Sequence, residues 1–189
     1  MVLSTLAEAT RRGQVVALVD ALDRADPRSA AALGVDLMRM LWIRGAPLTV
    51  ERARPAVIDQ AIKQAVRACD LVIRAGGFAV VVLDLGDIPV RRLQALPAIT
   101  WLRLAHANEG CETVGLLVAD ASIGRSARGV SVDLEATPCW TGTSAQSRRL
   151  AGFAPAFSPR SAGLLPRRAP VGAAMGSGGC GRHGVLSLR

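Results

Sequence analysis

The stretch Ala79-Val80-Val81-Val82-Leu83-Asp84 decides the fold that this sequence predicts. Gly76-Gly77 break the chain before it, and Gly86 and Pro89 follow it, so the apolar run is short. A short run that is apolar on both faces is typical of a strand buried in a parallel sheet. Its carboxylate, Asp84, falls at the edge where open α/β sheets bind ligands. Asp84 could hold Mg²⁺ or its water there, or it could simply begin a turn.

The segments on either side of this strand alternate between helical and strand patterns. We expect strands over residues 15–20, 41–43, 114–119 and 130–134, and helices over residues 2–12, 27–33, 55–75 and 90–108, the last interrupted near Pro97. Asp26 is the expected N-cap of the second helix, with Pro27 in its first turn. This alternation predicts an α/β fold, a mostly parallel sheet with helices on both faces.

The longest predicted helix, residues 55–75, has a continuous apolar stripe along one face. On its exposed side, Asp59/Lys63 and Asp70/Arg74 are spaced as i,i+4 pairs with the acid first. These pairs predict a helix that packs one face on the sheet and presents the other to solvent.

The positive charge is concentrated near the C-terminus. Residues 138–189 contain seven arginines and no acid, and so supply seven of the eight formal charges in the 189-residue chain. We expect one core domain over residues 1–137 and a basic, Pro/Gly/Arg-rich and largely disordered tail over residues 138–189. A basic tail favours nucleic acid or an acidic protein as partner. A coding bias toward arginine would give the same composition without any binding role.

Cysteine use and hydropathy favour a cytoplasmic protein. Cys69, Cys111, Cys139 and Cys180 are scattered without metal-ligand spacing, so we expect free thiols and no zinc site. No apolar run approaches the ~18–20 residues that span a bilayer. No signal peptide is expected, because arginines follow the first short apolar segment.

Two passages together resemble RecA recombinases. The run from Val16 to Asp20, followed by Asp26-Pro27-Arg28-Ser29-Ala30-Ala31-Ala32-Leu33-Gly34-Val35-Asp36, is similar to the family segment after the phosphate loop. The strand that ends at Asp84 falls where the family keeps its magnesium-side aspartate. Leu41-Trp42-Ile43-Arg44 and Ser147-Arg148-Arg149-Leu150 are closer to the ImuA-type branch. The similarity covers roughly residues 2–152.

The resemblance implies a RecA-like sheet and a role in the SOS response to DNA damage. ImuA-type proteins are associated with an ImuB-like, Y-family-like polymerase homologue and an error-prone replicative-type polymerase in translesion synthesis. The implied activity is that of an accessory protein in error-prone DNA repair. Its implied partners are these polymerase subunits, a RecA filament and single-stranded DNA, in the cytoplasm or at the nucleoid. The related SulA branch implies an alternative, inhibition of cell division.

Departures from the family argue against catalysis by this chain. A phosphate loop should precede the helix at residues 2–12, so we expect a sheet that lacks its first strand and this loop. The family's catalytic Glu falls at Leu22, which cannot orient water, and its nucleotide-sensing Gln falls near Asp120. We therefore expect no ATP hydrolysis and no cofactor. ATP and Mg²⁺ would bind only if a loop lies upstream, which would make the protein a DNA-dependent ATPase and this chain a truncated or frameshifted product.

The candidate binding residues follow from these arguments. No catalytic residue and no metal ligand set is predicted, and Asp84 is a possible relic of a magnesium site. Arg148, Arg149, Arg167 and Arg168 are candidates for contact with DNA or a partner, with few aromatic residues nearby to stack on bases. The alternative is a solvated tail. The edge left by the missing strand should lower solubility unless a partner or a second copy covers it.

Three further features have structural explanations. The glycine-rich run at residues 176–181 is expected to be a flexible tail rather than a phosphate site. His106 is expected at the surface, and Trp101 in the core. For Asp20, which also ends a strand, we favour a turn-forming role over a share in a cation site.

Overall fold

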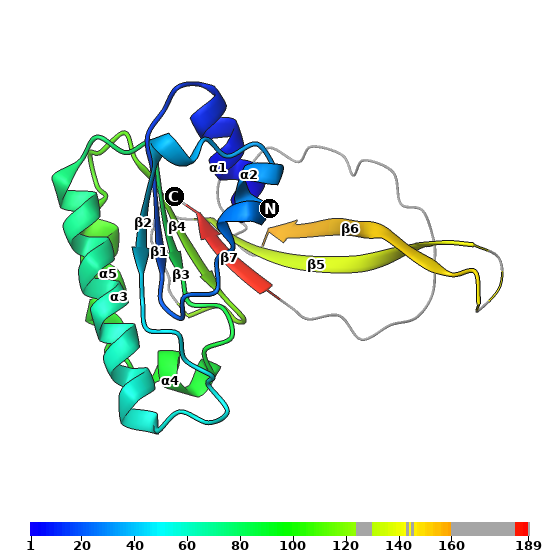
Figure 1. Cartoon of the computed structure of the whole chain (residues 1–189). Helices are drawn as coiled ribbons and strands as arrows, with labels where there is room; N and C mark the ends of the chain where they lie inside the picture. The colour runs from blue at the N-terminus through cyan, green and yellow to red at the C-terminus, as the bar shows by residue number, and fades with distance from the viewer. Residues whose placement is uncertain (124–129, 143, 145, 160–183, 189) are drawn as a thin grey trace.

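The computed structural model describes residues 1–123, 130–142, 144, 146–159 and 184–188. Within these ranges four adjacent parallel strands form one side of a seven-stranded sheet, and helices flank these four strands (Figure 1). They are β1 (Val16–Asp20), β2 (Met40–Arg44), β3 (Val80–Asp84) and β4 (Val114–Ala119), in the order β2-β1-β3-β4. The predicted α/β class, a parallel sheet with covering helices, is confirmed.

Helices cover both faces of this parallel sheet. On one face lie α1 (Val2–Arg11) and α2 (Pro27–Ala32); on the other lie α3 (Pro55–Ala75), α4 (Val90–Gln94) and α5 (Ala98–Ala107). A short 3-10 helix, η1 (Leu37–Arg39), leads into β2. The interruption expected near Pro97 separates α4 from α5.

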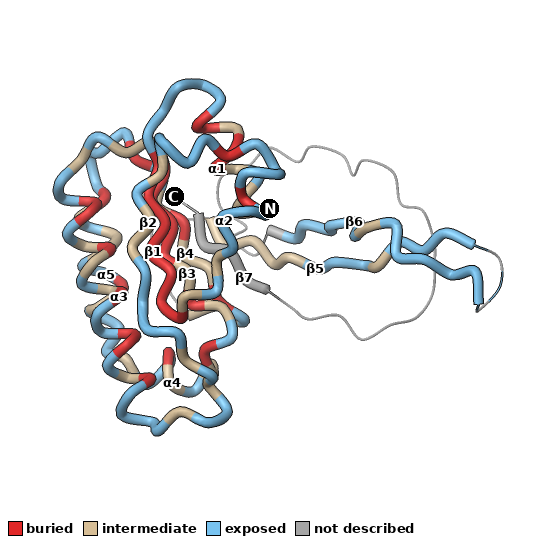
Figure 2. Tube along the Cα trace, in the orientation of Figure 1, coloured by how far each residue is buried: buried red, intermediate tan, exposed pale blue. Residues whose placement is uncertain are grey.

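The central strands are buried on both faces, as their apolar composition requires. Because side chains alternate along a strand, Leu18 and Val82 pack under α1 and α2, whereas Val19 and Leu83 pack under α3. The buried residues of β1 and β3 form a continuous band through the middle of the molecule (Figure 2). The only carboxylates of β1 and β3 are the aspartates at their carboxyl ends, Asp20 and Asp84.

Local signals set the boundaries of α2. Asp26 accepts hydrogen bonds from the backbone N–H groups of Arg28 at 3.3 Å and Ser29 at 2.9 Å, and Pro27 occupies the first turn. The predicted cap is therefore confirmed. A carboxylate at this position satisfies N–H groups that have no partner within the helix.

The side of β4 away from β3 is covered by strands that are distant in sequence. Strand β7 (Gly184–Leu188) pairs antiparallel with β4, and β5 (Val130–Thr141) pairs antiparallel with β7. Strand β6 (Arg149–Pro159) completes the order β2-β1-β3-β4-β7-β5-β6. The edges of the described sheet are thus β2 and β6, and a segment distant in sequence fills the place beside β4.

Strands β5 and β6 form a long hairpin that projects from the helix-covered body (Figure 1). The domain boundary expected after residue 137 falls inside β5. The expectation of little regular structure beyond Pro138 is wrong for residues 138–141 and 149–159, which are strands. The glycine-rich run at 176–181 lies outside the described residues. No helix in the described ranges is long and apolar enough to cross a membrane.

Candidate functional site

Two aspartates meet at the carboxyl edge of the parallel sheet. Asp20 ends β1 and Asp84 ends β3, and the two residues are paired in the register of these neighbouring strands. Asp20 is only 2 % exposed, and its carboxylate accepts hydrogen bonds from the backbone N–H groups of Arg24 at 2.9 Å and Ala25 at 2.8 Å. These bonds fold the chain after β1, so Asp20 has the turn-forming role that we favoured.

The carboxylate of Asp84 accepts fewer hydrogen bonds than that of Asp20. One carboxylate oxygen accepts a hydrogen bond from the backbone N–H of Gly86 at 2.9 Å. Burial raises the pKa of the Asp84 carboxyl above its ordinary value; the Gly86 bond opposes the rise, and the charges of Asp20, Asp87 and Asp120 add to it. The Asp84 carboxylate is therefore a poorly solvated charge among like charges.

This edge has little of the machinery of a metal or catalytic site. Within the described residues, no group of three or more His, Cys, Asp or Glu side chains is placed to hold a metal ion. Leu22, where the family's catalytic Glu would fall, is 2 % exposed and packs in the core under α3. A buried leucine can neither hold nor activate a water molecule.

A second candidate site lies on the β5–β6 hairpin. Its register pairs Leu134 with Phe157, Ala136 with Pro155, Pro138 with Phe153 and Trp140 with Leu150. The register shifts between Cys139 and Trp140, so Ala151 is the extra residue of a β-bulge. On both sides of the bulge, residues that are paired across the two strands still point to the same face of the hairpin. All eight paired residues consequently share one face, which we call the apolar face of the hairpin.

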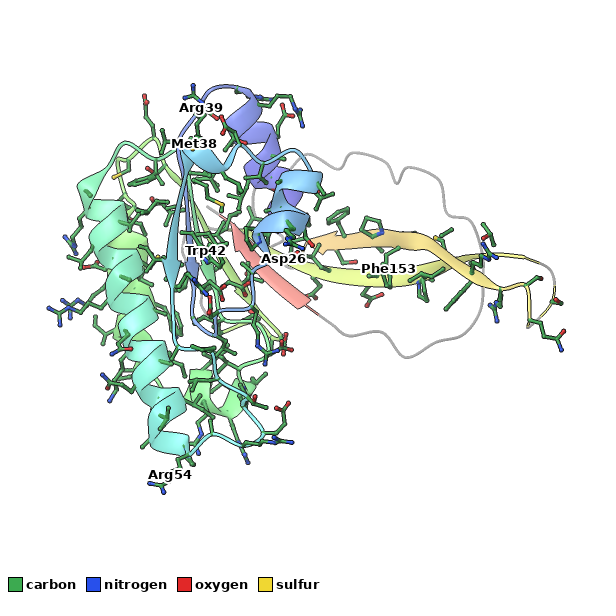
Figure 3. The ribbon with its side chains drawn as sticks, viewed as in Figure 1. Asp26, Met38, Arg39, Trp42, Arg54 and Phe153 are labelled. Carbon is green, nitrogen blue, oxygen red and sulfur yellow. The ribbon has the colours of Figure 1, made fainter. Side chains whose placement is uncertain are left out.

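The apolar face is open to solvent. Phe153 is 62 % exposed, Phe157 52 %, Trp140 49 % and Leu150 48 %. Figure 3 shows Phe153 well out along the hairpin, away from the helix-covered body. A concentration of large apolar side chains on a projecting element marks an interaction surface.

One cation, Arg148, lies at the outer end of this face. The guanidinium of Arg148 lies over the ring of Trp140, 5.3 Å from its centroid, and both Arg148 and Arg149 are exposed. Arg149 pairs with Thr141, whose hydroxyl donates to the Arg149 carbonyl at 3.4 Å. The structure thus places Arg148 beside an exposed aromatic ring, whereas the paired positions Thr141 and Arg149 alternate to the opposite face of the hairpin. Arg167 and Arg168, the other two, lie outside the described residues.

The apolar face was not predicted, although its signal is present in the sequence. Leu134, Ala136, Pro138 and Trp140 alternate with mostly polar residues, continuing the pattern recognised for residues 130–134. Pro138 weakens that signal because proline cannot donate to a strand ladder. The partner strand, with two further prolines, has no clear alternation, and its pairing became visible only in three dimensions.

Other residues singled out from the sequence have structural roles. His106 is exposed, with its Nδ1 2.8 Å from a carboxylate oxygen of Glu109, and Trp101 is 8 % exposed in the core. Cys69, Cys111 and Cys139 are free thiols, and burial raises the pKa of Cys69 to about 12. Cys180 lies outside the described residues. A thiol with such a pKa is not a nucleophile at neutral pH.

The two candidate sites differ in what they can do. The sheet edge offers a lone, poorly solvated carboxylate, and the hairpin offers an exposed surface of aromatic, aliphatic and cationic groups suited to binding. No protein-family model matches the sequence, and no curated protein matches it significantly.

Proposed function

We propose that this chain is a RecA-like accessory protein of the DNA damage response that acts in translesion synthesis by binding rather than by ATP hydrolysis. The sequence resemblance supports this proposal, together with the all-parallel order β2-β1-β3-β4 and the aspartates that end β1 and β3. In this interpretation the sheet is a RecA-like one without its first strand and phosphate loop. The proposed partners are translesion polymerase subunits and a RecA filament in the cytoplasm.

The observation that carries the binding role is the apolar face of the hairpin, with Arg148 over its Trp140 ring. Single-stranded nucleic acid is bound by aromatic side chains that stack on bases and by cations that track the phosphates. Trp140 and Phe153 lie on one face, with the guanidinium of Arg148 over the Trp140 ring. We propose single-stranded DNA as a ligand of this face.

The test is fluorescence anisotropy of a labelled oligothymidylate titrated with the full chain. Trp140→Ala should weaken binding by about 5-fold to 150-fold, the range expected for losing one stacked base. Arg148→Ala should weaken it less and reduce the salt dependence of the affinity. The matched control is Arg28→Ala, an exposed arginine on α2, which should leave the affinity unchanged.

The result that would overturn the DNA contact is specific. If Trp140→Ala and Arg28→Ala bind the oligonucleotide with equal affinity, the hairpin is not the DNA surface. Tryptophan fluorescence gives an independent check, because Trp140 is far more exposed than Trp101. DNA that stacks on Trp140 should quench the wild-type emission more than that of Trp140→Phe.

Titration of a fluorescent ATP analogue with Mg²⁺ separates this proposal from the ATPase alternative. We expect no saturable binding to this chain at millimolar ligand, because a lone carboxylate provides no cradle for the β- and γ-phosphates. Saturable binding that Asp84→Ala abolishes would contradict the proposal. The sheet edge would then be a nucleotide site and the protein a nucleotide-dependent switch.

A further inference from the structure

Helices α3 and α5 contact each other, and residues of both line a groove. The groove has a volume of about 490 Å³. Residues of both helices and of the turn before α5 line it: Lys63, Val66, Arg67, Asp70, Leu71, Leu96, Pro97, Ile99, Thr100, Arg103 and Leu104. It is separate from the hairpin and from the strand ends.

The floor and rim of the groove are aliphatic. Val66, Leu96 and Leu104 are half-buried and pack against the core from below. Leu71 and Ile99 are 60 % and 59 % exposed, and both line the groove. Apolar side chains around a concave surface lose more water when a partner fills it than scattered ones do.

The charges around the groove are positive and largely unbalanced. Asp70 is bound by Arg74, whose Nε lies 2.9 Å from a carboxylate oxygen. The predicted Asp59/Lys63 pair does not form, because Asp59 instead faces Arg92 at 3.5 Å. In the described part of the chain, Lys63, Arg67 and Arg103 are therefore left without an ion-pair partner.

The groove fits a short helix. From Lys63 to Leu71 the wall formed by α3 is about 12 Å long at the usual rise per residue. Apolar anchors at positions i and i+7 of a docked helix lie about 10 Å apart, so such a helix would fill the groove over two turns. No aromatic residue is among the lining residues, which makes this a poor site for stacking nucleic-acid bases.

The positive charge of the groove favours an acidic binding partner. Residues 138–189 of this chain contain no acid, so the chain's own C-terminal region does not complement three cations. A second copy complements these cations less well than an acidic partner does, because basic residues outnumber acidic ones 23 to 15 in the chain. An acidic partner supplies the missing charge and is steered to the groove.

We infer that the groove between α3 and α5 binds an acidic amphipathic helix of a partner protein, with apolar residues at i, i+3 or i+4, and i+7. The apolar anchors contact Leu71, Ile99 and the half-buried floor, and the carboxylates face Lys63, Arg67 and Arg103. This inference goes beyond the proposed DNA contact and does not depend on it, since the two surfaces share no residue.

The experiment uses the full chain and three labelled peptides of about 18 residues. The first has leucines at the stated spacing with glutamates elsewhere, the second replaces the glutamates by lysines, and the third replaces the leucines by glutamines. Only the first should bind saturably by fluorescence anisotropy. Leu71→Glu should weaken its binding by about 10-fold or more. Leu33→Glu should have no effect, because Leu33 is a similarly exposed leucine (54 % against 60 %) on the opposite face of the sheet.

Charge reversal distinguishes recognition from damage to the fold. Arg67→Glu with Arg103→Glu should lose the acidic peptide and gain the lysine peptide, which a merely misfolded variant would not do. Arg28→Glu is the matched control and should bind as the wild type does. The groove variants should keep the wild-type affinity for oligothymidylate. A failure of the peptide-binding inference can therefore be distinguished from a failure of the proposed DNA contact.

Four outcomes would overturn the inference. They are equal binding of the acidic and lysine peptides, no saturable binding of the acidic peptide, loss of DNA affinity on charge reversal, and a dimer in sedimentation that Leu71→Glu dissociates. The third outcome would identify the groove as a nucleic-acid contact. The fourth would identify its occupant as a second copy of this chain.

Discussion

Asp84 shows how the environment of one residue changes its chemistry. The carboxylate ends a buried strand, accepts one backbone hydrogen bond and lies near three other aspartates. Removal from water raises the pKa of this carboxyl above its ordinary value of 3.8. Since the folded pKa lies above the unfolded one, the folded state binds more protons between the two values. The free energy of unfolding therefore falls as pH rises through that window, and the loss persists at higher pH.

Asp84→Asn should consequently raise the thermal unfolding midpoint at pH 7. Asparagine keeps an oxygen that can accept from the Gly86 N–H, and it removes the poorly solvated charge. The gain should shrink as pH falls through the raised pKa toward the ordinary value of 3.8, because the wild-type carboxyl takes up its proton in this window. Calorimetry over this range measures it. A variant less stable than wild type at pH 7 would mean that the charge has a favourable partner in the fold.

At the scale of single elements, α3 shows why a helix face matters more than helix propensity. Its apolar stripe packs Ile58, Ile62 and Val72 against the sheet, with Ile62 1 % exposed. Leu71 on the same helix is 60 % exposed and lines the groove. Two aliphatic residues nine positions apart thus have different roles, one in stability and one in the proposed docking site.

Ile62→Ala should lower the free energy of unfolding by about 2–4 kcal/mol, because it removes buried methyl groups and leaves a cavity. Leu71→Ala on the same helix should cost less than about 0.5 kcal/mol, because the side chain is mostly in water. Urea titrations of both variants give the two values. Similar losses for the two substitutions would be incompatible with the observed orientation of α3.

The hairpin shows how context overrides strand propensity. Pro138 and Pro155 both lie in its strands, where proline is normally excluded because it has no N–H to donate. Beyond Leu134 strand β5 has only β6 beside it, and β6 is an edge of the described sheet. In this projecting ribbon each strand has one unpaired side, so a missing N–H can be accommodated there.

At the scale of the whole molecule, β7 joins the parallel sheet to the hairpin. Its backbone pairs with β4 on one side and with β5 on the other, so residues 184–188 close the sheet across a large sequence separation. Such non-local pairing costs chain entropy and is rewarded only once both neighbouring strands are in place. Order in β5 and β6 should therefore depend on β7.

Leu186→Pro should separate the two parts of the sheet. Position 186 pairs with Val118 in β4 and with Val132 in β5, and proline removes the N–H from this ladder. Hydrogen exchange should accelerate at amides of β4 and β5, while β1 stays protected. Leu186→Ala keeps the backbone N–H and is the control. Unchanged exchange in β4 after the proline substitution would mean that β7 does not pair there.

The sequence by itself determined the helix-covered body. Short β-branched runs, the stripe of residues 55–75, the Asp26 cap and the break at Pro97 are local signals, and the corresponding elements form nearly where they were expected. The turn-forming role of Asp20 was likewise favoured from its place at a strand end. Period and capping are properties of neighbours in sequence, so they can be read without a structure.

Only the tertiary structure decided the covered edge of β4, the apolar face of the hairpin and the cationic groove. Each depends on pairing between distant segments: β7 with β4, Trp140 with Leu150, and α3 with α5. The groove's charge also depends on Asp59 pairing with Arg92 rather than with Lys63. The free energy of these contacts comes from residues that sequence order keeps apart, so no local pattern records which of the possible partners is chosen.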